Sequence, residues 1–222
     1  MKLSAALFDA GFLWILALVV GVLIVAAFWC APWKALIEKA ERQHAFFAAW
    51  LSLVVMMHLQ ISWVDGLVSI HFLMMTSIVV IFGWSFSMII GLLAHVLLSV
   101  WHQDYSIVVA ANYFLSVIIP ASTAYTIYRI IIQHQSKNLF VFLLGGGFFG
   151  AIATLLFSLA ALFILLMLNQ QWDILEELYH KSLMVVLLSY SEGFLNGMVV
   201  TALTVFFPGI VRTFDEKKYL DS

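Results

Sequence analysis

Five polar side chains interrupt stretches that are otherwise almost entirely apolar: His58, His71, His95, Asn112 and Glu192. A titratable or amide side chain is costly in hydrocarbon, so such residues usually face the interior of a helix bundle or a water-filled cavity. Imidazole, carboxamide and carboxylate groups together suit a borderline metal ion such as nickel, cobalt or zinc. They also suit a small polar organic substrate. Their spacing forms no closed metal-binding motif, so both kinds of ligand stay open on this evidence.

The composition predicts an all-α, polytopic membrane protein. Of the 222 residues, 64% are hydrophobic and 10% are charged, whereas a soluble domain carries about 25% charged residues. The charges gather in short segments between long apolar runs, which is typical of a helical membrane protein. No stretch is left for a separate soluble domain, so we expect residues 1–222 to form a single integral membrane domain. The net charge of -2 does not favour nucleic-acid binding.

Seven transmembrane helices are predicted, because a helix needs about 20 apolar residues to cross a bilayer. The third and fourth come from one uncharged run, 66–101, which is too long for one helix and which we divide at Gly83. Asp9 interrupts the first apolar run, so we interpret the N-terminal segment as retained and not as a cleaved signal peptide. The expected spans cover residues 11–31, 45–63, 66–82, 84–101, 106–132, 139–168 and 183–207.

The charge distribution supports the division at Gly83. Cytoplasmic loops of membrane proteins collect lysine and arginine. With seven spans and the N-terminus outside, only Lys2 and Lys181 of the 10 lysines and arginines lie outside. With six spans this bias nearly disappears. We therefore expect the N-terminus outside and the C-terminus in the cytoplasm.

This topology places the polar side chains in the outer half of the bilayer. His58, His71, His95 and Asn112 lie five or six residues from the outer ends of their spans. At about 1.5 Å per residue, this corresponds to a depth of roughly 8–9 Å, and Glu192 lies at roughly 15 Å. We therefore predict a tight bundle around an outward-facing pocket that these five residues bound.

Neighbouring residues extend two of these positions along predicted helix faces. At helical spacing, His71 shares a face with Met74 and Met75. Glu192 belongs to a polar stripe on the last span. Glycines four residues apart let another helix approach closely, and two such pairs occur: Gly146 with Gly150, and Gly193 with Gly197.

Simpler structural roles stay open for several residues. His58 or His95, taken singly, could hydrogen-bond only a neighbouring carbonyl group, and Met74 and Met75 could serve only for packing. Cys30 is the single cysteine, so it cannot form an internal disulfide, and we interpret it as a small packing residue.

Four segments resemble the CbiM/NikM-type permeases, the substrate-capturing membrane subunits of energy-coupling factor (ECF) ABC transporters for cobalt and nickel. In chain order the segments are SIHFLMMTSIVVIFGW, ANYFLSVIIP, LFVFLLGGGFFGA and SEGFLNGMVVTALTVFFPGIVRTFDEKKYL. They look most like the branch described only as predicted membrane proteins of that superfamily. The family's seven spans and outer N-terminus agree with the topology expected here.

The resemblance implies which residues bind the substrate. In such permeases the metal is held by the free N-terminal amine, by a histidine at the second residue, and by a histidine at the start of an early span. The amine corresponds to Met1 and the last histidine to His71. Asn112 falls where the family carries an asparagine after its next loop, and Glu192 falls in a glutamate-containing motif near the last span.

Position 2 departs from the family pattern. The chain has Lys2 where metal-binding members carry histidine. A lysine ammonium group is protonated near neutral pH, has no lone pair and repels a divalent cation. His58 or His95 would have to supply the missing ligand.

The resemblance implies a substrate-binding subunit that captures a small substrate, such as a cobalt or nickel ion, and has no permanently bound cofactor. The sequence contains no GxxxxGK[ST] phosphate-binding loop. A separate ATPase and a coupling membrane subunit are therefore the expected partners, within the lipid bilayer of a bacterial inner membrane. HExxH and GxSxG motifs are absent too, so we expect no enzymatic activity. The alternative is a membrane assembly or scaffold protein that kept the bundle and lost the metal.

Overall fold

Long apolar runs form the helices that make up most of the protein. The computed structural model describes residues 1–133 and 138–214. Within these residues, five helical segments are long and apolar enough to cross a membrane. They are α1 (Ala10–Cys30), α5 (Trp84–His102), the continuous α6 (Val108–Tyr113), η2 (Phe114–Ile118) and α7 (Ile119–Gln133), the continuous η3 (Val141–Phe149) and α8 (Gly150–Leu168), and α10 (Ser182–Phe206). The prediction of a largely helical membrane protein is confirmed, whereas the number of crossings and the orientation of the termini stay predictions.

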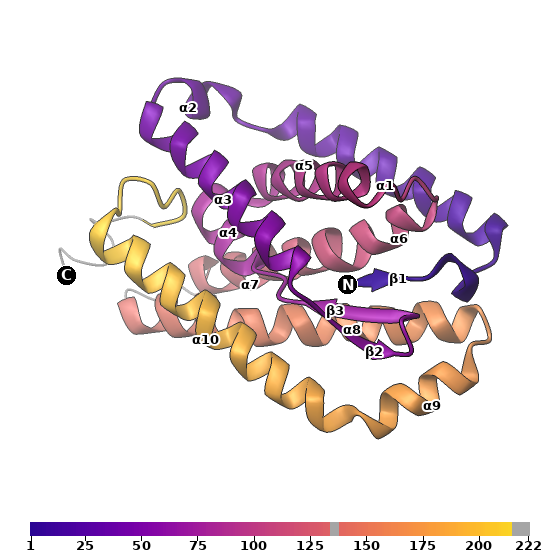
Figure 1. Ribbon diagram of the computed structural model, residues 1–222. Coiled ribbons are helices and arrows are strands. Elements are labelled where there is room, and N and C mark those ends of the chain that lie inside the picture. The colour runs from indigo at the N-terminus through magenta and orange to yellow at the C-terminus, as the bar shows by residue number, and fades with distance from the viewer. Residues whose placement is uncertain (134–137, 215–222) are drawn as a thin grey trace.

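The other helices are shorter or more polar, and they connect or cover the long ones (Figure 1). The helix α3 packs against α5, and α4 packs against α7. The short α2 joins α1 to α3, and the amphipathic α9 joins α8 to α10. Their bounds are η1 (Ala5–Leu7), α2 (Trp33–Ile37), α3 (Ala40–His58), α4 (Met75–Phe82) and α9 (Trp172–His180).

A small antiparallel sheet lies at the end of the bundle that also carries α9 (Figure 1). Its strands are β1 (Lys2–Leu3), β2 (Gln60–Val64) and β3 (Val68–His71), in the order β1-β3-β2. Asp65 and Gly66 turn the chain between β2 and β3 with φ angles of 36° and 82°. An Asp-Gly pair tolerates such positive φ values and favours a tight hairpin.

The prediction of a helix over residues 66–82 is wrong for residues 66–74. The hairpin turns the chain back on itself, so His71 lies on a strand and not on a helix face with Met74 and Met75. Met74 has a left-handed φ of 53°, and α4 begins only at Met75. The preceding helix also ends earlier than predicted, at His58, because residues 60–64 pair with β3.

The division at Gly83 is confirmed. This residue ends α4 and precedes α5 with a φ of 82°, a conformation that glycine adopts without steric cost. The expected helices over 11–31, 84–101, 106–132, 139–168 and 183–207 begin and end within about two residues of the observed ones, which is the usual ambiguity of helix ends.

Glycines allow α10 to pack closely on η3 and α8. A Cβ atom added at Gly193 would lie 2.9 Å from Ile152 Cγ1, and one added at Gly147 would lie 3.3 Å from the Cα atom of Gly197. The expected close approach at Gly193 and Gly197 is therefore confirmed. On the facing segment η3, Gly147 makes the close contact. A Cβ atom added at Gly146 would be only in ordinary van der Waals contact with its neighbours.

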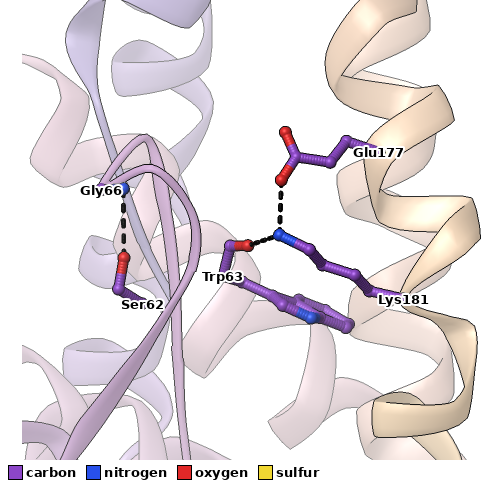
Figure 2. A network of polar contacts seen from close by, with 5 residues as sticks. All are labelled: Ser62, Trp63, Gly66, Glu177 and Lys181. Carbon is purple, nitrogen blue, oxygen red and sulfur yellow. Dashed lines mark hydrogen bonds and ion pairs between the residues drawn. The ribbon is translucent and has the colours of Figure 1, made fainter.

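The hairpin is attached to the helices through Lys181, which lies between α9 and α10. Its ammonium group donates hydrogen bonds to the carbonyl oxygen of Trp63 and to the carboxylate of Glu177 (Figure 2). At the other side of the turn, the Gly66 N–H donates to Ser62 Oγ over 3.1 Å. The Lys181 bond to Trp63 fixes the sheet that carries His71 to the bundle, and the Gly66 bond closes the turn.

Candidate functional site

The first residues of the chain run into the interior as an edge strand. Lys2 pairs with Ser69 and Leu3 pairs with Val68, both on β3. This antiparallel register carries Met1 past the end of the pairing toward His71. Met1 is only 1% exposed, so the chain terminus is enclosed by protein.

The terminal amine lies against the imidazole of His71. The Met1 nitrogen is 2.6 Å from His71 Nε2, and both groups are buried. His71 Nδ1 lies 2.9 Å from the carbonyl oxygen of Phe72, so Nδ1 carries the proton and donates it there. The lone pair is consequently on Nε2 and faces the amine.

Burial also changes the charge state of the amine. Loss of hydration lowers the pKa of the Met1 amine from 8.0 to about 4, because a buried charge is poorly solvated. The neutral amine therefore predominates at neutral pH and carries a lone pair of its own. Two uncharged nitrogen atoms, each with a lone pair, thus lie side by side.

Asn112, on α6, holds the terminal strand in place. Its Oδ1 accepts a hydrogen bond of 2.8 Å from the buried N–H of Leu3. The two-residue strand β1 is therefore bonded to β3 on one side and to a helix on the other. Asn112 is 6% exposed.

His95, on α5, adds a third buried polar group to the same region. Its Nδ1 donates to the carbonyl oxygen of Gly91 over 3.0 Å, and its Nε2 lies 3.1 Å from Ser116 Oγ. The ring meets Tyr113 edge to face, with centroids 5.3 Å apart. His95 is thus held in one orientation by the backbone and an aromatic ring.

Met1, His71, His95 and Asn112 line one cavity of about 60 Å³. This volume accommodates an ion with a few water molecules, and not a large metabolite. Lys2 lines the cavity as well, at the position where the family pattern has a histidine.

Neither His58 nor Glu192 lines this cavity. His58 is the exposed last residue of α3, and its ring stacks on that of His102 with centroids 5.7 Å apart. Glu192 is fully buried and binds the backbone of the β3–α4 turn through Leu73 and Met74. It therefore positions the segment that follows His71.

Three further polar residues of the cavity were not singled out from the sequence: Gln60, His102 and Asp104. The pair His102 and Asp104 is visible in the sequence as a polar cluster directly after an apolar run. Gln60 gives no such indication, because its position follows from the hairpin. In the described part of the chain, no group of three or more His, Cys, Asp or Glu side chains could hold a metal ion.

A comparison with models of known families shows to which family the chain belongs. A model described as the cobalt uptake substrate-specific transmembrane region, CbiM, matches residues 3–210. The chain belongs to the CbiM family. The resemblance drawn from the four sequence segments is therefore confirmed. No curated protein and no solved structure matches the chain.

Membership in the CbiM family places the chain among the membrane components of cobalt uptake. These are components of transport and not a family of enzymes. The CbiM match begins at Leu3, the residue whose N–H Asn112 holds. The terminal strand, which carries the amine beside His71, thus adjoins the matched region.

Proposed function

We propose that the protein is the substrate-binding membrane subunit of an ECF-type transporter and captures a cobalt or nickel ion. The amine of Met1 and Nε2 of His71 are the first two ligands. The observation that supports this proposal is the 2.6 Å separation of these two buried nitrogens. The two-residue strand β1 brings the amine beside the imidazole. Packing alone does not require an amine at that point.

The spacing of the two nitrogens is close to that of neighbouring ligands on one metal ion. Two nitrogen ligands at about 2.0–2.1 Å from a metal, at a right angle, lie about 2.9 Å apart. The observed separation is 2.6 Å, so a shift of a few tenths of an ångström suffices. Both atoms carry lone pairs, and imidazole suits cobalt, nickel and zinc alike.

The rest of the cavity supports a small cation and its remaining ligands. His95 and Asn112 line the cavity, and each already has a hydrogen bond that orients it. Asp104 lines it too and supplies a negative charge. Water molecules complete the coordination of an ion in a cavity of about 60 Å³.

Uptake against a gradient needs an energy source that this sequence does not encode. The chain contains no GxxxxGK[ST] loop, which would be needed to bind nucleotide phosphates. We therefore propose a separate ATPase and a coupling membrane subunit as partners, in a bacterial inner membrane.

Metal binding to the purified full-length protein tests this proposal. Co²⁺ and Ni²⁺ are titrated calorimetrically into the wild type, into His71→Ala, and into a variant with two residues added before Met1. The added residues convert the amine to an amide and have no room in the buried position. Each change should weaken binding by about 100-fold or more, since loss of a mere outer-shell partner already costs about 10- to 100-fold.

His44→Ala is the matched control, because His44 is exposed near the opposite end of α3 and lines a different cavity. It should bind the metal like the wild type. Tight binding that survives both changes at the site would show that the metal binds elsewhere.

A scaffold or assembly role is the second candidate. It is favoured by Lys2, which lines the cavity and carries a positive charge that repels a divalent cation. The absence of a three-residue His, Cys, Asp or Glu cluster among the described residues points the same way. Failure of the wild type to bind Co²⁺, Ni²⁺ or Zn²⁺ would favour this role over transport.

A further inference from the structure

Two arginines line one small cavity at the end of the bundle opposite the sheet. Arg42 belongs to the first turn of α3, and Arg212 lies in the segment that follows α10. Both line a cavity of about 20 Å³ that also contacts α2 and α4. Figure 1 shows α2 and the segment after α10 at this end, far from β1.

Within the described residues, the hydrogen bonds of the two guanidinium groups go to backbone carbonyl oxygens and not to carboxylates. Arg42 Nη1 donates to the carbonyl oxygen of Ala35 over 3.2 Å. Arg212 Nη1 donates to the carbonyl oxygen of Phe82, also over 3.2 Å. Both acceptors are neutral. Arg42 Nε is buried and has no hydrogen-bond partner in the described part of the chain.

No acidic side chain compensates these charges within the described residues. The ion pairs found there are those of Glu176 with His180 and Glu177 with Lys181, both on α9 and its end. Glu41 is adjacent to Arg42 in sequence, but it lines a neighbouring cavity with His44. The N-terminus of α3, which has no side-chain cap, adds further positive potential.

The surroundings of the arginines are apolar. Leu36, Ile81, Phe86 and Ile210 line the same cavity. Trp33 packs edge to face on Phe86, with centroids 5.5 Å apart, and is itself exposed. Tryptophan beside cationic side chains at the end of apolar helices is typical of the membrane–water interface.

We propose that Arg42 and Arg212 bind the phosphate group of an anionic phospholipid. A guanidinium group matches phosphate oxygens in geometry and charge, and Arg42 Nε supplies an unused donor. The cavity is large enough for one phosphate oxygen, and the exposed ring of Trp33 beside it offers an apolar contact for the glycerol and the upper acyl chains. A phospholipid supplies the negative charge and an apolar surface together, whereas a soluble anion leaves Trp33 uncovered.

Retention of lipid by the full-length protein tests the assignment. Native mass spectrometry compares bound phosphatidylglycerol with phosphatidylcholine for the wild type, Arg42→Gln, Arg42→Lys and Arg212→Gln. Each Gln variant should retain phosphatidylglycerol about tenfold less, the value of one charge-assisted hydrogen bond. Arg42→Lys keeps the charge but loses Nε, so it should retain an intermediate amount. Thermal unfolding in detergent alone verifies that each variant is folded.

Lys34→Gln is the matched control, because Lys34 is an exposed cation on α2 that does not line the cavity. It should retain lipid like the wild type. If Lys34→Gln and Arg42→Gln lose the same amount of lipid, the effect depends only on the overall positive charge, and the proposed site is wrong. Displacement of the lipid by millimolar inorganic phosphate would overturn the choice of a lipid. Retention by Arg42→Lys equal to the wild type would overturn the role of Nε.

Discussion

The carboxylate of Glu192, on α10, accepts a hydrogen bond from the N–H of Met74, the residue that precedes α4 and provides no side-chain cap of its own. Its Oε1 lies 2.7 Å from the backbone nitrogen of Met74, and its Oε2 lies 2.9 Å from that of Leu73. One turn later, Asn196 accepts from the N–H of Ser77 over 2.9 Å. The first N–H groups of a helix lack partners within the helix. From α10, Asn196 supplies the acceptor for Ser77 in the first turn of α4, and Glu192 holds the two N–H groups just before it.

Glu192→Gln should therefore destabilise the protein. The amide NH₂ of glutamine would face a backbone N–H, and one of the two donors would lose its acceptor. A buried donor without a partner costs about 1–3 kcal/mol, so the thermal midpoint should fall. Because the capped turn follows His71 directly, cobalt affinity should fall as well. Thermal unfolding in detergent and calorimetric titration measure the two effects.

Glu176→Gln provides the control for this change. It is the same substitution on α9, where the side chain is exposed and lies 3.8 Å from His180. Its unfolding midpoint should match that of the wild type. Equal midpoints for Glu192→Gln and Glu176→Gln would contradict the capping role.

The long helices were predictable from the sequence because each follows from a local property. An apolar run of sufficient length must be a helix in a bilayer, and Gly83 marks the break in the run 66–101 with a positive φ. The hairpin was missed although Asp65-Gly66 is a strong local indication of a tight turn. The long apolar run from Gly66 onward favoured a helix instead, and the turn signal was not used.

The site itself depends on contacts that no local pattern encodes. Lys2–Leu3 is too short to be recognised as a strand, and its partner lies more than 60 residues away. The depth of His58 was counted along a helix that ends at that residue. Glu192 was predicted to bound the pocket, which it does not line, and its capping role requires knowing that α4 begins at Met75.

Asn112→Ala should expose the terminal amine. The substitution removes the acceptor of the Leu3 N–H and leaves β1 bonded only to β3. The strand should then open more often, and the Met1 amine should react about tenfold faster with an acylating reagent, since about 1.4 kcal/mol corresponds to tenfold. Mass spectrometry of the N-terminal peptide gives the rate.

Asn169→Ala is the matched control for the reactivity measurement. Asn169 also accepts a hydrogen bond from the N-terminal segment, over 3.0 Å, but at the exposed N–H of Asp9. Its removal should leave acylation of Met1 unchanged. If both variants react alike, Asn112 has no particular role in holding the strand.

Gly83→Ala should destabilise the junction between α4 and α5. The residue has a φ of 82°, and an added Cβ atom would lie 3.1 Å from Arg212 Nη1. With a ψ of 172°, this conformation is essentially confined to glycine and costs an alanine about 1–3 kcal/mol. The comparison is Gly21→Ala in α1, where an added Cβ has nothing within 4 Å. That variant should unfold no earlier than the wild type, and a Gly83→Ala midpoint equal to that of Gly21→Ala would contradict the prediction.

Lys2→His should strengthen the binding of cobalt and nickel. Lys2 lines the cavity with Met1 and His71. An imidazole there replaces a repelling charge by a lone pair, so affinity should rise by about tenfold or more, the effect expected even of an outer-shell partner. Lys2→Gln removes the charge without adding a ligand and should gain less. The gain of Lys2→His should also disappear below a pH of about 6.5, where an imidazole of ordinary pKa is protonated. Calorimetric titration at several pH values separates the two variants, and equal affinities throughout would show that position 2 contributes no ligand.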